Sequence, residues 1–100
     1  MAALNPVIHQ PTRLRIMAAL VSLPEGDRAD FTLLRDLLEL TDGNLSVHLR
    51  RLEEAGYVAT EKTFVGRRPK TWIWATESGR EAFAAHVDAL EKIIRQTKEA

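Results

Sequence analysis

The stretch that decides the fold is residues 41–58, which read TDGNLSVHLRRLEEAGYV. Three of its leucines recur at i, i+4 and i+7, the spacing of one apolar stripe on an α-helix: Leu45, Leu49 and Leu52. Thr41 or Asp42 is suited to cap the N-terminus of that helix, and Gly56 stands where a C-cap glycine belongs. The stretch therefore predicts a helix over residues 43–55 whose leucine side packs into a core.

The side of this helix opposite the leucines is mostly polar, because successive residues turn by about 100°. Six of its residues are candidates for contact with DNA: Asn44, Ser46, Val47, His48, Arg50 and Arg51. The guanidinium of Arg50 matches O6 and N7 of guanine, Asn44 can pair with adenine, and Val47 can touch a thymine methyl group. His48 lies at the edge of the stripe, so DNA contact and packing against a backbone group both stay open. Taken alone, the two arginines are better explained as solvated side chains.

The residues before this helix predict further short elements. Asn5-Pro6 and Gln10-Pro11 each mark the start of a helix, since proline is tolerated in the first turn. Apolar residues at helical spacing predict a helix over residues 12–23. An extended piece over residues 29–31 should follow, and Thr32 is expected to cap the next helix, which carries two pairs of leucines.

After the stretch, the sequence changes to the pattern of a β-hairpin. Residues 57–65 and 70–75 are rich in β-branched and aromatic side chains, and residues 66–69, Gly-Arg-Arg-Pro, form a polar turn between them. Four cations near this turn are candidates for contact with phosphates or the minor groove: Lys62, Arg67, Arg68 and Lys70. An ordinary solvated hairpin tip is the alternative.

The aromatic residues are assigned to packing. Trp72 and Trp74 lie on one face of their strand, where they could stack on single-stranded bases, but packing in the core or in a dimer is the favoured interpretation. Phe31, Phe64 and Phe83 are also assigned to packing.

The last helix is expected over residues 77–97, with Thr76 as its cap. Its apolar residues step by 4, 3 and 4, the spacing of a short coiled coil: Phe83, Val87, Leu90 and Ile94. They either cover the core of the same chain or, where the helix runs beyond that core, form a two-fold dimer interface.

Composition bounds the class of protein. One hundred residues with 45% hydrophobic content suit a single domain over residues 1–100. The net charge is zero, yet residues 43–76 hold six basic and three acidic side chains, a net charge of +3 that suits a polyanionic partner. The absence of cysteine, of a membrane-length apolar run and of a secretory signal at the N-terminus leads us to expect a cytoplasmic protein.

The same residues argue against an enzyme or a metal sensor. The sequence has no glycine-rich phosphate loop, no zinc-protease helix and no nucleophile elbow. His9, His48 and His86 are scattered along the sequence, with no cysteine beside them. We therefore expect neither catalysis nor a cofactor or metal.

The order helix, short strand, helix, helix, hairpin, helix resembles that of winged helix-turn-helix regulators, an α+β fold that is mainly helical. Ser-x-His-Leu from residue 46, followed by Leu-Glu-Glu-Ala-Gly-Tyr-Val from residue 52, is similar to the recognition helix of the arsenical-repressor (ArsR) and multiple-antibiotic-resistance-regulator (MarR) families. The resemblance covers about residues 5–95. Metal-sensing members carry cysteine or histidine ligands, which this sequence does not repeat.

The resemblance implies a function. It implies a homodimer that binds double-stranded DNA as a transcriptional regulator, which we expect to be a repressor, with helix 43–55 in the major groove. The wing, residues 62–70, would lie on the backbone or minor groove. The alternative is a winged helix that contacts protein or RNA, although such a surface would more often be apolar. No effector is predicted.

Overall fold

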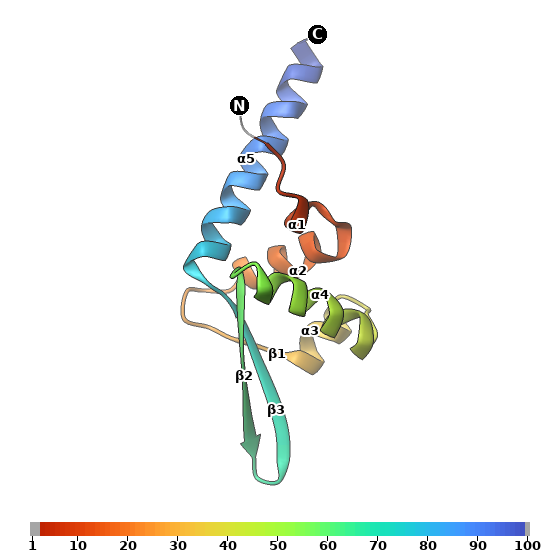
Figure 1. Cartoon of the computed structure of the whole chain (residues 1–100), viewed down its shortest axis with the longest axis vertical. Helices are drawn as coiled ribbons and strands as arrows, with labels where there is room; N and C mark the ends of the chain where they lie inside the picture. Colours follow the sequence, from red (N-terminus) through yellow and green to blue (C-terminus); the bar gives the residue numbers. More distant parts are fainter. Residues whose placement is uncertain (1–2, 100) are drawn as a thin grey trace.

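The computed structural model describes residues 3–99, and within them the chain forms five helices and three strands (Figure 1). The elements are α1 (Pro6–His9), α2 (Pro11–Val21), β1 (Ala29–Asp30), α3 (Phe31–Leu37), α4 (Asp42–Glu54), β2 (Val58–Val65), β3 (Arg68–Ala75) and α5 (Glu77–Glu99). The strands form one antiparallel sheet in the order β1-β3-β2. This confirms the predicted α+β class and the predicted order of elements. Within residues 3–99, no helix has both the length and the apolarity needed to cross a bilayer.

The helix starts near the N-terminus follow the expected prolines. The Asn5 side chain accepts hydrogen bonds from the backbone N–H groups of Val7 and Ile8 and so caps α1. The Gln10 side chain accepts one from the N–H of Arg13, at 2.8 Å, and caps α2. In both helices proline occupies the first turn, where its missing N–H costs no hydrogen bond.

The cap of α3 is Asp30 rather than the expected Thr32. The Asp30 carboxylate accepts a hydrogen bond from the N–H of Leu33 at 3.3 Å, which places Thr32 inside the helix. Asp30 is also the last residue of β1, where it pairs with Trp72 of β3. Because its backbone is still extended, the chain can turn into the helix at once, and the carboxylate is in place to cap it.

The decisive helix, α4, matches its prediction to within one residue at each end. The Thr41 hydroxyl accepts a hydrogen bond from the N–H of Asn44 at 3.1 Å. Gly56 follows the helix with a φ of 82°, a left-handed conformation that favours glycine. The leucine stripe points inward as expected, with exposed fractions of 0% for Leu45, 4% for Leu49 and 0% for Leu52.

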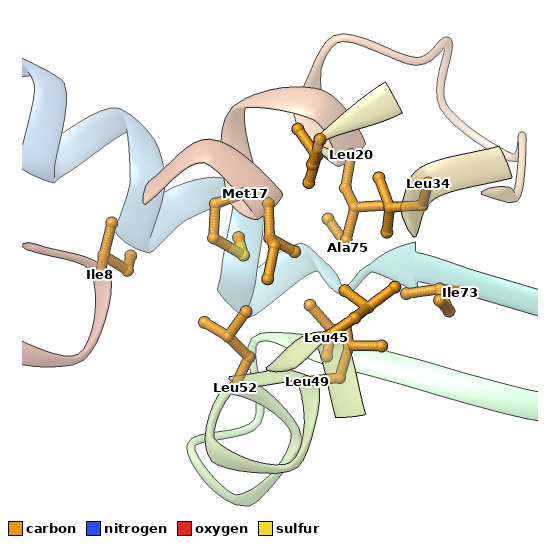
Figure 2. Close-up of a cluster of buried hydrophobic side chains, with 12 residues drawn as sticks. Ile8, Met17, Leu20, Leu34, Leu45, Leu49, Leu52, Ile73 and Ala75 are labelled. Carbon is orange, nitrogen blue, oxygen red and sulfur yellow. The ribbon is translucent and has the colours of Figure 1, made fainter. Parts of the chain in front are cut away.

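The core lies where α4 meets α2, α3 and the inner face of the hairpin. Figure 2 shows Leu45, Leu49 and Leu52 pointing toward Met17, together with the other labelled core side chains. Burial of three leucines from one helix, at about 2 kcal/mol each, sets which side of α4 faces the interior. The opposite side is therefore turned outward by the same contacts.

The hairpin turn is tighter than predicted. Strand pairing continues to Val65 opposite Arg68, so the turn is only Gly66 and Arg67, and the expected four-residue turn over residues 66–69 is wrong. Gly66 has a φ of 66° whereas Arg67 has no positive φ, the sign pattern of the type II′ turn that suits the twist of a hairpin. Pro69 is tolerated in β3 because β1 pairs with β3 only near Ile73, which leaves β3 with one neighbour there.

Helix α5 starts against the base of the hairpin and then runs away from the body (Figure 1). The Thr76 hydroxyl accepts a hydrogen bond from the N–H of Gly79 at 2.9 Å, as expected for its cap. Gly79 lies so close to the hairpin base that a Cβ at this position would stand 2.0 Å from the carbonyl oxygen of Tyr57. The buried residues farther along are His86 and Ala89.

Candidate nucleic-acid interface

The outward side of α4 presents the residues that the sequence proposed for DNA contact. Five of the six are exposed: Asn44, Ser46, Val47, Arg50 and Arg51. Val47 is 67% exposed, so its methyl groups are available to an incoming ligand. The N-terminus of a helix also attracts anions, because its first N–H groups have no carbonyl partner within the helix. This side can therefore offer donors, a fork-shaped cation and a small apolar group to one partner.

The sixth residue, His48, is half-buried beside α2. Nη1 of Arg13 lies 3.2 Å from Nδ1 of His48, and since a guanidinium only donates, Nδ1 accepts. Burial, and then the charge of Arg13, lower the pKa of His48 below its ordinary value. The hydrogen-bond partner is thus a side chain of α2, and not the backbone group that the sequence left open.

Arg13 also lies near the positive charge of Arg51 on α4. Burial and the neighbouring charge of Arg51 lower the pKa of Arg13 below its ordinary value. Its Nε donates to the carbonyl oxygen of Val7, which anchors the side chain to α1. Sequence reasoning missed Arg13, because nothing in the pattern of α2 shows that it reaches α4.

A hollow separates α4 from the hairpin, and a cation from each side lines it. Arg50 comes from α4 and Lys62 from β2, with Ser46 and Thr71 in the same hollow of about 360 Å³. Glu53 also lines it and accepts a hydrogen bond from the Thr60 hydroxyl at 3.2 Å. The cations predicted on the helix and on the hairpin therefore include one from each that lines the same hollow.

The other hairpin cations lie on a different face. Directly opposed residues of an antiparallel pair point to the same side, so Lys62 and Thr71 share the face of the buried Ile73. Lys70 and Arg68 point to the outer face, where Nζ of Lys70 lies 5.2 Å from the centre of the Trp72 ring. The four predicted cations thus surround the hairpin rather than form one patch.

Comparison with known proteins identifies the family to which this chain belongs. Residues 12–94 match the family model described as a winged helix DNA-binding domain. The chain belongs to this winged-helix family. In its terms α4 is the recognition helix and the β2–β3 hairpin is the wing, as the sequence resemblance implied.

Individual relatives agree with this family. An uncharacterized protein of Methanocaldococcus jannaschii is 40% identical over 81 residues, which are 81% of this chain and 85% of that protein. A transcriptional regulator homologue from Pyrococcus horikoshii OT3 has a similar structure, with a TM-score of 0.81 and 33% identity over 91% of this chain and 87% of its own. NadR in complex with 4-hydroxyphenylacetate gives a TM-score of 0.59 and 25% identity, covering 94% and 72% of the two chains. The protein is a winged-helix DNA-binding regulator and not an enzyme.

The tryptophans of the wing do not pack in the core, which is one of the two kinds of packing that the sequence favoured; their packing in a dimer stays a prediction. They are half-buried on the outer face, because Ile73 between them takes the inward position. The Arg28 guanidinium lies 4.0 Å from the centre of the Trp74 ring, and Nε1 of Trp72 donates to the Thr63 hydroxyl at 3.0 Å.

The three phenylalanines differ in how far they are buried. Phe31 and Phe83 pack against the core, as expected. Phe64 is 73% exposed at the wing tip, so its assignment to packing is wrong. Its strand extends beyond the helices, and alternation alone does not reveal where the core ends.

Two histidines that are far apart in the sequence lie together in the winged-helix fold. The ring centres of His9 and His86 are 5.3 Å apart. His86 is 1% exposed, and its Nδ1 accepts a hydrogen bond from the N–H of Asn5 at 3.0 Å. The Asn5 side chain donates to the Tyr57 hydroxyl, which ties the chain before α1 to the base of the wing. Among residues 3–99, no three histidine, cysteine or acidic side chains gather closely enough to hold a metal.

Proposed function

We propose that the protein is a homodimeric transcriptional regulator that recognises a specific sequence of double-stranded DNA. The observation that carries the proposal is the shared hollow with Arg50 of the recognition helix on one side and Lys62 of the wing on the other. A duplex seated on this surface would meet the helix in its major groove and the wing on its backbone or minor groove.

The recognition helix would read bases from its outward side. The exposed guanidinium of Arg50 can donate to O6 and N7 of guanine, and the amide of Asn44 can pair with adenine. Val47 would touch a thymine methyl group, while Ser46, His48 and Arg51 would contact bases or phosphates. Donors of this kind give sequence preference, whereas phosphate contacts position the helix.

The wing would supply electrostatic attraction. Arg67 lies in the turn, with Lys62 on the inner face and Arg68 and Lys70 on the outer face. A hairpin with cations on both faces can approach the phosphates on both sides of a groove.

Dimerisation is the role that we propose for residues 77–97. Phe83 packs against the core of its own chain, whereas the end of α5 projects with apolar side chains exposed. Leu90 and Ile94, from the predicted stripe, and Ile93 beside them would pack against a second copy, with Val87 at the margin. A two-fold axis there would set two recognition helices about one DNA turn apart, ~34 Å.

We infer repression rather than activation, because a dimer seated on an operator would block access to that DNA. A target on the chromosome of a prokaryotic cell would place the protein in the cytoplasm. All residues from 1 to 100 would serve as one DNA-binding domain.

The experiment that tests the proposal is selection of bound sequences from random duplex DNA with the full-length protein. The expected product is a palindromic motif whose half-sites lie about 10 base pairs apart, one for each recognition helix. No enrichment above the starting pool would reject the proposed operator binding.

A further inference from the structure

The tip of the wing presents apolar side chains that no part of residues 3–99 covers. Phe64 is 73% exposed and Val65 is 59% exposed. Phe64 lies directly opposite Pro69, so the two share one face of the hairpin. Proline restricts the backbone of β3 opposite Phe64, which lowers the entropy lost when the tip binds a partner.

This face is the one that looks toward the recognition helix. Going from the tip to the base, Phe64 is followed on the same side by Lys62, which lines the hollow with Arg50. Val65 points to the opposite face, together with Arg68. The phenyl ring at the tip and the recognition helix therefore lie on the same side of the wing.

A second copy of the chain joined through α5 would not cover the tip. The molecule is 59 Å long, and Figure 1 shows the wing tip and the free end of α5 at its two opposite ends. The flanking residues Arg67 and Arg68 favour a polyanion at the tip instead. Charge complementarity thus selects a nucleic acid as the occupant.

We propose that Phe64, backed by Pro69, is a wedge that enters the minor groove and partly opens a base step next to the half-site. The inference rests on the DNA binding proposed above. Apolar side chains inserted in this way unstack a step and bend the duplex, while Arg67 and Arg68 hold the phosphates beside the wedge. Opening costs least at pyrimidine–purine steps, so the wing contributes sequence preference without reading a base edge.

The test compares four forms of the full-length protein on the selected duplex: wild type, Phe64→Ala, Phe64→Leu and Val65→Ala. The affinity is measured over a salt series, and the bend by energy transfer between dyes at the duplex ends. Phe64→Ala should bind about tenfold more weakly, since burial of a phenyl ring is lost. Its slope of log K against log salt should stay that of the wild type, because no phosphate contact is removed.

The matched variants identify the wedge. Phe64→Leu keeps an apolar side chain and should retain most of the bend, whereas Phe64→Ala should lose it. Val65→Ala removes an exposed apolar group from the opposite face and should bind and bend DNA as the wild type does. All four should melt alike, because both positions are exposed.

The possible failures are distinguishable. If the wild type binds no duplex, the proposed function fails and the wedge with it. If the wild type binds but Phe64→Ala shows the same affinity and bend, only the wedge is rejected. A Phe64→Ala variant that dissociates into monomers would assign the tip to a protein contact, and this outcome also overturns the inference.

Discussion

At the scale of single residues, the interface depends on which side chains are left free by the fold. His48 and Arg13 contact each other, which turns Nδ1 of His48 toward α2. Arg50 lines a hollow that is open to solvent, together with Ser46 and Lys62. Arg50 is therefore the residue of the recognition helix most able to form a bidentate contact with a base.

Replacement of Arg50 by alanine should weaken binding to the selected operator by about 1–3 kcal/mol and relax preference at one base pair, since a bidentate contact with guanine is lost. Gel-shift titrations on matched and mismatched duplexes measure both effects. Lys92→Ala, which removes one positive charge from the exposed part of α5, is the control and should leave operator preference unchanged. An equal loss on both duplexes would make Arg50 a phosphate contact.

The buried His86 makes stability depend on pH. Burial, and then the neighbouring His9, lower the pKa of His86 below its ordinary value. As the pH falls, the unfolded chain therefore takes up a proton at this histidine before the folded chain does. The contribution of neutral His86 to the free energy of unfolding is fully present above about pH 6.5 and decreases as the pH falls below it. The melting temperature should fall between pH 7 and pH 5.5.

His48 also has a lowered pKa and acts in the same direction, so a variant is needed to separate the two. His9→Ala removes one cause of the shift at His86 and should reduce the pH dependence of the melting temperature. A melting temperature that stays constant from pH 7 to pH 5.5 in the wild type would contradict the prediction.

At the scale of elements, we propose that the recognition helix and the wing make different contributions to DNA binding. The helix is held by the burial of three leucines, whereas the wing extends as a hairpin with a two-residue turn. Its cations are placed around the hairpin, so they can contribute attraction without one preferred base. The helix should supply the contacts to base edges, and the cations of the wing should supply most of the salt dependence.

Replacement of both Arg67 and Arg68 by alanine should lower affinity for every duplex alike. The slope of log K against log salt should fall by roughly one unit for each lost phosphate contact. A titration over a salt series on operator and random DNA checks this, again with Lys92→Ala as the control. An unchanged slope would mean that the wing does not contact phosphates.

At the scale of the whole molecule, α5 would place the two proposed functions at opposite ends of the chain's longest axis. Its first turns pack closely on the base of the wing through Gly79, and its middle is buried at His86 and Ala89. Its far end carries Ile93 and Ile94, which are 43% and 53% exposed. The end that we propose for dimerisation is thus distant from the end that we propose for DNA contact.

The double substitution Ile93→Glu and Ile94→Glu should convert the dimer into a folded monomer, since two charges would be placed in an apolar interface. Sedimentation at micromolar concentration measures the mass, and circular dichroism checks the fold. Truncation after Glu81 is a poorer test, because it also removes His86 and Ala89. A wild type that is already monomeric would remove the dimer proposal.

Much of the proposed site could be predicted because its decisive features are local. The leucine stripe, the Thr41 cap and Gly56 each act within a few residues, so periodicity and capping chemistry located α4 and its outward side. The wing could be predicted, but not which of its two faces meets the core. Alternation places Trp72 and Trp74 on one face and Ile73 on the other without showing which face is turned inward.

The sequence by itself determined the order of elements and the side of the recognition helix that faces outward, because both follow from contacts within one helix or one hairpin. Only the tertiary structure decided that His86 meets Asn5 across 81 residues, that Trp72 and Trp74 lie outside the core, and that Phe64 is exposed. These depend on where distant segments pack, and no local periodicity records how far the core extends.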